Sequence, residues 1–296
     1  MSIRYQLVKN ISQAYILNNL LNLTFPPFDK KTKSLIVQEP MLGVVARDDD
    51  KIIGAIVFEA VSQIRNPEIL SFFVRKEYRN KGIGSELFNM ANKVITKANI
   101  REPLVFFRSS WKAAEKTAHL LKKHGWTTPV PVFQVYKSSI REFSKVKWPS
   151  DTTLPEPYQL VNYAEIKTQQ KIVIQDALKE KKIPHYLFPF HKENYIQQTV
   201  SSFLLYEGSI SGWLIGYRNT AESVEYNNLF LFPEHRKKIT LPMVMLHNAI
   251  SKQLQENIPE GIWIIQASNT KMIAYIERYF AAAIKKKEIM LKSVKK

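Results

Sequence analysis

The residues best suited to chemistry lie in one turn, Arg75-Lys-Glu-Tyr-Arg-Asn-Lys-Gly-Ile-Gly84. An apolar stretch ends just before it at Val74, and a stretch with helical periodicity begins just after it near Ser85. The chain holds only nine glycines, and two of them stand in this turn, two residues apart. Glycines at a strand-to-helix junction let backbone N–H groups converge, and the helix N-terminus adds a positive dipole end. With the charges of Arg79 and Lys81, the turn predicts a binding site for a diphosphate.

Two better-known phosphate loops are excluded by the residues of this turn. A dinucleotide fingerprint needs a third glycine at position 87, where Leu87 stands. A P-loop needs Gly-Lys followed by Ser or Thr, which the turn lacks. The alternative that stays open is a plain tight turn at Gly82 and Gly84, because short glycine motifs often arise by chance.

The elements around the turn can be predicted from hydrophobic periodicity. Apolar residues recur with the 3.6-residue helical period from Leu87 to Ala98, and a further helix is expected from Lys112 to Lys123. Strand, turn, helix and strand follow one another here as in a β-α-β unit. The predicted strands are 44–46, 52–58, 69–74 and 104–107.

A linker divides the chain near its midpoint. Residues 147–157 contain three prolines with Ser, Asp and Thr between them, a composition that excludes regular structure. We therefore expect domains at residues 1–146 and 158–296, each of ordinary domain size.

The two halves carry similar segments in the same order. Phe73–Lys81 (FVRKEYRNK) is echoed by Phe230–Lys238 (FLFPEHRKK) about 157 residues later. Such echoes in register favour a duplicated domain. Two shorter pairs support it: Phe25–Lys30 with Phe188–Lys192, and Val135–Ser138 with Met290–Ser293.

In its strand–turn–helix context, the turn resembles the signature loop of the GNAT superfamily of coenzyme A-dependent N-acyltransferases, Arg/Gln-x-x-Gly-x-Gly/Ala, here Arg79-Asn-Lys-Gly82-Ile-Gly84. The resemblance covers about residues 5 to 140. It implies an α/β (α+β) protein of two tandem GNAT-like domains, each a central mixed, mostly antiparallel sheet flanked by helices. It also implies that the strand backbone holds the pantetheine arm and that the loop amides hold the pyrophosphate. The implied cofactor-binding residues are Phe72, Phe73, Val74, Arg79, Asn80, Lys81, Gly82, Ile83, Gly84 and Ser85.

The second half resembles a GNAT repeat whose loop has changed. Ile239 and Leu241 replace the two glycines, and their side chains would block the close approach of a diphosphate. We therefore expect the second domain not to bind coenzyme A in the usual way. Tandem GNAT proteins with one working and one degenerate half are known in the family.

Acid–base chemistry is harder to assign. In the family a Glu on the third or fourth strand often acts as the base through water. The resemblance therefore makes Glu68 the first candidate for the base and Glu59 the second. The alternative is that both are solvated carboxylates at strand ends. The family's usual acid is a Tyr four residues before a Gly, but Leu121 stands there. Substitutes near it are His119, His124 and Tyr78, and the second half places Tyr275 near the equivalent position, where a core role is the alternative.

Composition and charge limit the kinds of partner that the protein is expected to have. The net charge is +17, and residues 1–148 carry 24 basic against 12 acidic side chains. This favours an anionic partner: the cofactor itself, or an acidic protein such as an acyl carrier protein; the alternative is a solvated basic face. Nucleic acid is disfavoured because no recognition motif is present. There is no long apolar run, no secretory leader, no cysteine and no zinc-ligand spacing, so we expect a cytoplasmic protein without a metal or membrane contact.

The sequence thus predicts an acyl-CoA-dependent N-acyltransferase that uses acetyl-CoA or a longer acyl-CoA and transfers by direct attack of an amine on the thioester. The acceptor is a small amine or an amino group of a peptide or protein. Two alternatives stay open, a non-catalytic acyl-CoA-binding protein and a nucleic-acid-binding protein. The Phe-Pro segments Phe25–Phe28 and Phe188–Phe190 are expected either to line the acceptor side or to fix helices to the core.

Overall fold

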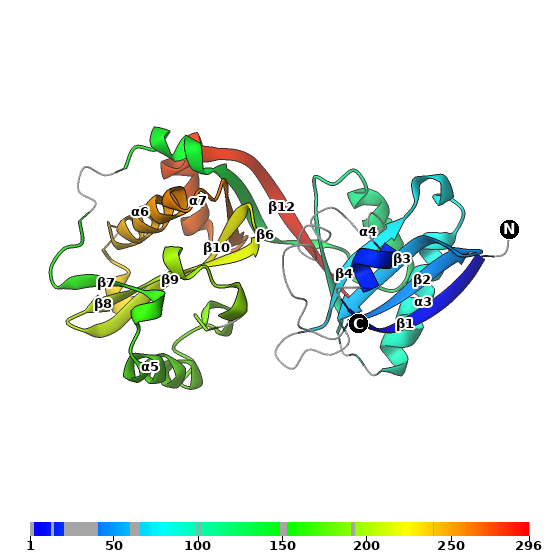
Figure 1. The fold of residues 1–296 in the computed structure, drawn as a ribbon, viewed down its shortest axis with the longest axis horizontal. Coiled ribbons are helices and arrows are strands. Elements are labelled where there is room, and N and C mark those ends of the chain that lie inside the picture. The colour runs from blue at the N-terminus through cyan, green and yellow to red at the C-terminus, as the bar shows by residue number, and fades with distance from the viewer. Residues whose placement is uncertain are drawn as a thin grey trace. The chain divides into compact units, whose positions relative to one another are not determined.

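The chain forms two compact units (Figure 1). Unit 1 comprises residues 1–132 and 288–296, and unit 2 comprises residues 133–287. Each is described by itself. The computed structural model describes residues 3–12, 15–20, 41–59, 66–98, 100, 102–148, 153–190, 193–238 and 240–295.

Unit 1 is built on a mixed sheet with the strand order β1-β2-β3-β4-β5-β12. Neighbouring strands are antiparallel except β4 and β5, which run parallel. The predicted strands around the loop are confirmed, with slightly wider bounds. The strands are β1 (Ile3–Ile11), β2 (Met41–Asp48), β3 (Lys51–Glu59), β4 (Glu68–Val74), β5 (Leu104–Arg108) and the last part of β12 (Ile284–Val294).

The two predicted helices are confirmed, and both cover the same face of this sheet. In α3 (Ile83–Lys97) the residues Ile83, Leu87, Ala91 and Ile95 recur every four positions and are buried. Such spacing places them on one helix face. α4 (Ala114–Lys123) adds Leu121 to the same hydrophobic core, which the structure completes with side chains of β2 to β5. The opposite face of the sheet carries a second, smaller cluster.

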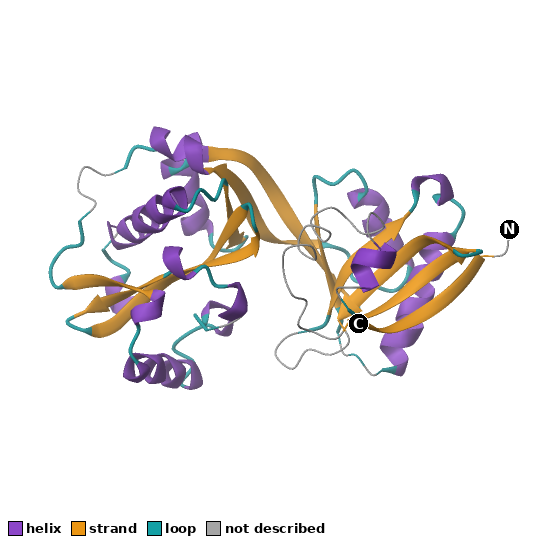
Figure 2. Ribbon diagram, viewed as in Figure 1, coloured by secondary structure: helices purple, strands orange, loops and turns teal. Residues whose placement is uncertain are grey.

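Unit 2 repeats this architecture, with the strand order β6-β11-β10-β9-β8-β7. β10 and β11 are the parallel pair, which corresponds to β4 and β5. In each unit a sheet is flanked by helices, which confirms the predicted fold class (Figure 2). The elements are β6 (Val130–Ser139), β7 (Tyr158–Asn162), β8 (Ser202–Tyr206), β9 (Ser209–Thr220), β10 (Ser223–Leu231), β11 (Glu260–Gln266), α5 (Thr168–Lys179), α6 (Thr240–Gln255) and α7 (Thr270–Tyr279).

The two units exchange their last strands. β6, which follows α4 in the chain, pairs antiparallel with β11 of unit 2 over residues 133–139. The final strand β12 pairs with β5 of unit 1, from Met290 opposite Arg108 to Val294 opposite Leu104. The compact units therefore differ from the predicted domains 1–146 and 158–296. Residues 133–146 pack in unit 2, and residues 288–296 complete unit 1.

Residues of the predicted linker and of the second Phe-Pro segment pack against the core of unit 2. Trp148 and Leu154, which belong to the predicted linker, pack against the core of unit 2. Phe188 and Phe190 pack in another cluster of that unit, which supports their role in fixing the core. The segment Phe25–Phe28 lies outside the described residues. Within the described part of the chain, no helix is both long and apolar enough to cross a membrane.

Candidate functional site

The parallel strands β4 and β5 pair over only two positions and then part. Glu68 lies opposite Leu104 and Ile69 opposite Val105, with no further pairs between the two strands. Beyond this point β4 stays paired with β3 as far as Val74, opposite Gly54. Residues 70–74 of β4 and 106–108 of β5 are called the fork below. One edge of β4 thus offers its backbone groups within the fork.

A loop stabilised by its own arginine follows β4. The Arg79 side chain donates from Nε to the Val74 carbonyl over 2.8 Å, and its guanidinium lies over the Phe73 ring at 5.3 Å. Arg75 is held as well, since its Nε donates to the Ile52 carbonyl over 2.9 Å. These contacts fix the course of the chain from the end of β4 to the start of α3.

The backbone of this loop needs its glycine at position 82. Gly82 has φ +79° and stands immediately before α3, and Asn80 also has a positive φ of 62°. Around Gly82 a Cβ would meet nothing within 4 Å, so the space beside its backbone is open. At Gly84, by contrast, a Cβ would lie 3.1 Å from the Phe72 ring. The first glycine therefore serves the turn and the open space, and the second lets α3 pack closely on β4.

The N–H groups at the start of α3 are available to a ligand. The backbone N–H groups from Asn80 to Ser85 have no hydrogen-bond acceptor among the described residues. The first helical bond runs from the N–H of Glu86 to the Gly82 carbonyl. No side chain caps the helix. Unpaired donors at a helix N-terminus, next to open space and the charge of Arg79, suit an anion. The loop residues therefore fit the pyrophosphate of coenzyme A.

The two candidate base residues, Glu59 and Glu68, lie at the other end of β4. Glu59 ends β3, is 4% exposed, and accepts the backbone N–H of Glu68 over 3.1 Å. Glu68 is half-buried and begins β4. The structure thus brings the Glu59 side chain to the backbone of Glu68 at the base of the fork, where β4 and β5 still pair.

The candidate acids differ in their burial and in their hydrogen bonds. Leu121, which replaces the usual Tyr, is fully buried in the core. Tyr78 donates its hydroxyl to Asp48 over 2.9 Å, and this bond raises the pKa of Tyr78. His119 is exposed. His124 stacks on Phe88, its Nε2 is buried without a hydrogen-bond partner among the described residues, and burial lowers its pKa.

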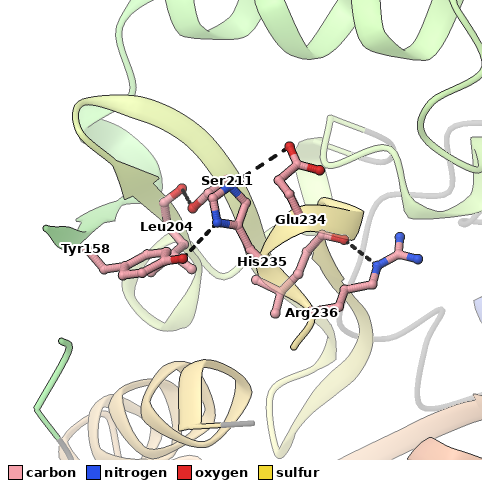
Figure 3. Close-up of polar contacts among 7 residues, drawn as sticks. Tyr158, Leu204, Ser211, Glu234, His235 and Arg236 are labelled. Carbon is pink, nitrogen blue, oxygen red and sulfur yellow. Dashed lines mark hydrogen bonds and ion pairs between the residues drawn. The ribbon is translucent and has the colours of Figure 1, made fainter. Parts of the chain in front are cut away.

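The loop after β10 in unit 2 keeps the arginine contacts (Figure 3). Arg236 donates from Nε to the Leu231 carbonyl over 2.8 Å and lies over the Phe230 ring at 5.4 Å. His235 takes the place of Tyr78, and its Nδ1 lies 2.8 Å from the Tyr158 hydroxyl in a hydrogen bond. The two loops therefore correspond residue by residue, as the sequence echo predicts.

The donors of the second loop are largely used or missing. The N–H of Leu241 donates to the Lys238 carbonyl over 3.2 Å, the N–H of Lys238 donates to the His235 carbonyl, and Pro242 has no N–H. The Leu241 side chain is fully buried in the core of unit 2. Ile239 lies outside the described residues. The row of donors found in the first loop is therefore interrupted here at three positions, Lys238, Leu241 and Pro242.

Tyr275 lies within α7 and packs against the core of unit 2. Its hydroxyl is buried and has no hydrogen-bond partner among the described residues, and burial raises its pKa. The position favours the core role over that of an acid for a cofactor bound in unit 1.

A buried ion pair beside the fork was not expected from the sequence. Glu288 of β12 binds Arg108 at the end of β5 and accepts a hydrogen bond from the Ser110 hydroxyl. The only signal for it was a single acid within the lysine-rich segment KKKEIMLKSVKK. No group of three His, Asp or Glu side chains that could hold a metal occurs among the residues that the structure describes.

Comparison with known proteins agrees with this geometry. The family model of the GNAT acetyltransferase domain matches residues 41–128, from the start of β2 to five residues beyond α4. The sequence matches none of the curated proteins.

Among solved structures, a tandem GNAT protein from the clavulanic acid biosynthesis pathway covers 99% of both chains, with a TM-score of 0.70 and 13% identity. A GCN5-related glucosamine N-acetyltransferase region of a fungal multi-domain GH3 β-N-acetylglucosaminidase has a TM-score of 0.72 and 14% identity, and covers 99% of this chain and 38% of that one. A GNAT-family acetyltransferase from Colwellia psychrerythraea has a TM-score of 0.60 and 11% identity, over 98% and 100% of the two chains.

Residues 41–128, within unit 1, match the GNAT acetyltransferase domain. Over its whole length the chain has the fold of a tandem GNAT protein. That family and fold support acyl transfer from coenzyme A to an amine in general.

Proposed function

We propose that unit 1 is an N-acyltransferase that moves the acyl group of acetyl-CoA, or of a longer acyl-CoA, to an amine. The observation that carries the proposal is the row of N–H groups from Asn80 to Ser85, which have no acceptor among the described residues, beside open space and Arg79. Backbone donors that converge at a helix start bind phosphate oxygens, and coenzyme A carries a diphosphate.

The edge of β4 supports the rest of the cofactor. Six residue steps separate Glu68 from Val74, or about 20 Å at 3.3 Å per residue. A cofactor with its diphosphate at the loop therefore needs an extended arm to bring its thioester to the carboxylates. Coenzyme A has such an arm, and the unpaired edge of residues 70–74 offers backbone groups to its amides.

The reaction proceeds by direct attack of the amine nitrogen on the thioester carbon. A C–N bond forms, the C–S bond breaks, and the sulfur leaves as a thiolate. The ammonium proton goes to a base, which we assign to Glu68 acting through water. Glu59 fixes the start of β4 by accepting the Glu68 backbone N–H. The thiolate leaves without the usual tyrosine, because Leu121 is buried in the core.

The test compares binding with turnover. Glu68→Gln is expected to lower kcat by about 100-fold with the affinity for acetyl-CoA unchanged, as measured by free-thiol release with a panel of amines. Glu115→Gln is the matched control, because Glu115 is exposed in the first turn of α4. Unchanged kcat in Glu68→Gln contradicts the assignment of the base.

The buried Leu121 also favours a second candidate, an acyl-CoA-binding protein without transferase activity. The two candidates differ in one result. Tight acetyl-CoA binding without thiol release for any amine in the panel supports the second candidate and contradicts the first.

Exposed lysines on and before α4 support an acidic macromolecular partner, such as an acyl carrier protein or an acidic peptide. Arg108 does not belong to this surface, because it binds the buried Glu288. Reversing Lys122 and Lys123 to Glu is expected to slow transfer with such a partner and to leave transfer from acetyl-CoA to a small amine unchanged. The exposed lysines are Lys112, Lys116, Lys122 and Lys123.

A further inference from the structure

The ion pair between Arg108 and Glu288 stands at the tip of one side of the fork. Arg108 is the last residue of β5, three residues beyond the last β4–β5 pair at Val105. Its partner Glu288 comes from the far end of the chain, from strand β12, whose residues Met290–Val294 pair with β5. The exchanged strand therefore pairs with β5 on its side away from β4 and supplies the carboxylate that binds Arg108.

The side chain of Arg108 lies on the sheet face opposite α3. Phe107 packs with α3 and α4 in the core, so its neighbour Arg108 points to the other face. On β4, Phe73 packs against the cluster of that other face, and Ser71 shares its side. The N–H groups at the start of α3 belong to the face that α3 covers. The anion bound by the loop and any group bound by Arg108 are thus on opposite faces.

Glu288 holds the guanidinium in one orientation. Its side chain is 1% exposed, and its two carboxylate oxygens bind Arg108 Nη1 and the Ser110 hydroxyl. A buried carboxylate is stable only with such partners. The Arg108 side chain, at 17% exposure, still reaches the surface, and its Nε and Nη2 have no acceptor among the described residues. A planar guanidinium with free donors and a fixed orientation suits a carboxylate.

Other polar groups share this face with Arg108. The Ser71 hydroxyl is buried and has no hydrogen-bond partner among the described residues. Glu59 alternates with Val57, which belongs to the cluster on that face, so Glu59 is on the same side. The face therefore carries the Glu59 side chain at the base of the fork and the Arg108–Glu288 ion pair near its tip.

We propose that the acceptor of unit 1 is an amine that also carries a carboxylate, that Arg108 binds this carboxylate, and that Glu288 positions Arg108. The inference rests on the proposed N-acyltransferase function. The amine lies towards Glu59 and Glu68, and the carboxylate lies towards the tip of the fork.

The experiment uses matched amines that differ only in the carboxylate group. Lysine is compared with cadaverine, and triglycine with its C-terminal amide. Each is titrated into the full-length protein saturated with desulfo-CoA, and each is then assayed for thiol release with acetyl-CoA. The carboxylate-bearing member of each pair is expected to bind about tenfold more tightly or better.

Variants locate the preference at Arg108. Arg108→Gln is expected to abolish it, and Arg108→Lys to retain part of it, while the affinities for cadaverine and for acetyl-CoA stay unchanged. Because Arg108→Gln leaves the Glu288 carboxylate buried alone, the double variant Arg108→Gln/Glu288→Gln is measured beside it. Glu288→Gln by itself is expected to weaken the preference and to leave the affinity for cadaverine unchanged. Lys112→Gln, which changes an exposed residue of the segment after β5, is the control.

Equal binding within both pairs, or no binding of any of the four amines, overturns the inference. A fall in acetyl-CoA affinity in Arg108→Lys also overturns it, because Arg108 would then serve the cofactor. Failure of the proposed function is a different result: absence of thiol release for all amines while the binding preference for the carboxylate persists.

Discussion

The loops after β4 and β10 share one arginine contact and differ in their backbone amides. Arg79 and Arg236 each donate to the last carbonyl of the preceding strand over 2.8 Å and each lie over a Phe ring. After the first arginine, the N–H groups from Asn80 to Ser85 have no acceptor among the described residues. After the second, Leu241 fills the core and its N–H bonds within the loop.

This difference separates a structural role from an anion-binding role in a motif that occurs twice in the chain. The arginine contact is structural, since it persists where the donors are lost. Anion binding depends instead on whether the helix start keeps its N–H groups free and open to solvent. The predictions below test that division, from the largest expected effect to the smallest.

Gly82→Val is expected to weaken acetyl-CoA binding by at least about 100-fold. Valine at φ +79° is strained by about 1–2 kcal/mol, and its side chain fills the open space beside the loop donors. Isothermal titration calorimetry measures the loss, and circular dichroism checks the fold. Lys237→Ala, at the equivalent loop of unit 2, is the control and is expected to bind normally.

Leu241→Ala is expected to lower the free energy of unfolding by about 2–5 kcal/mol, because it leaves a cavity in the core of unit 2. It is not expected to create a second acetyl-CoA site, since Pro242 still lacks an N–H. Denaturant unfolding and titration of the same sample check both statements. A gain of a second site would show that side-chain volume alone closes this loop.

Arg79→Ala and Arg236→Ala change equivalent residues of the two loops, so their stabilities and acetyl-CoA affinities can be compared directly. Each removes the same contact with a strand carbonyl and a Phe ring, so the two are expected to destabilise the protein similarly. Only Arg79→Ala is expected to weaken acetyl-CoA binding, by about tenfold, through the loss of a charge beside the diphosphate. Equal loss of affinity in both variants would contradict the division between the loops.

His124→Phe makes the end of α4 resemble the end of α7, where Phe280 caps the helix. Burial lowers the pKa of His124 below 6.5, so the folded state binds a proton less readily than the unfolded state. Its stability is therefore greatest above pH 6.5 and falls as the pH drops towards the lowered pKa. His124→Phe is expected to lose less Tm between pH 7 and pH 5 than the wild type. Thermal melts at the two pH values measure this.

Much of the fold near the loop could be predicted because its signals are local. The helical spacing of Ile83, Leu87, Ala91 and Ile95 and the apolar run of β3 each determine an element within a few residues. The glycine spacing at 82 and 84 likewise indicated the strand–turn–helix junction. These features depend on sterics and periodicity rather than on distant partners.

The strand exchange could not be predicted, because it depends on long-range pairing. Val135–Ser138 and Met290–Ser293 are similar in sequence, so neither carries a local signal for which sheet it joins. The Arg108–Glu288 pair was missed for the same reason, since its members are 180 residues apart. The structure binds Arg108 to a buried carboxylate, which no local feature of the sequence indicates.

The stoichiometry of acetyl-CoA binding tests the comparison of the two loops most directly. Calorimetric titration of the full-length protein is predicted to give one site per chain, because Lys238, Leu241 and Pro242 interrupt the row of free N–H donors in the second loop. Two sites per chain, or one site that survives in Gly82→Val and is lost in Leu241→Ala, would contradict this account.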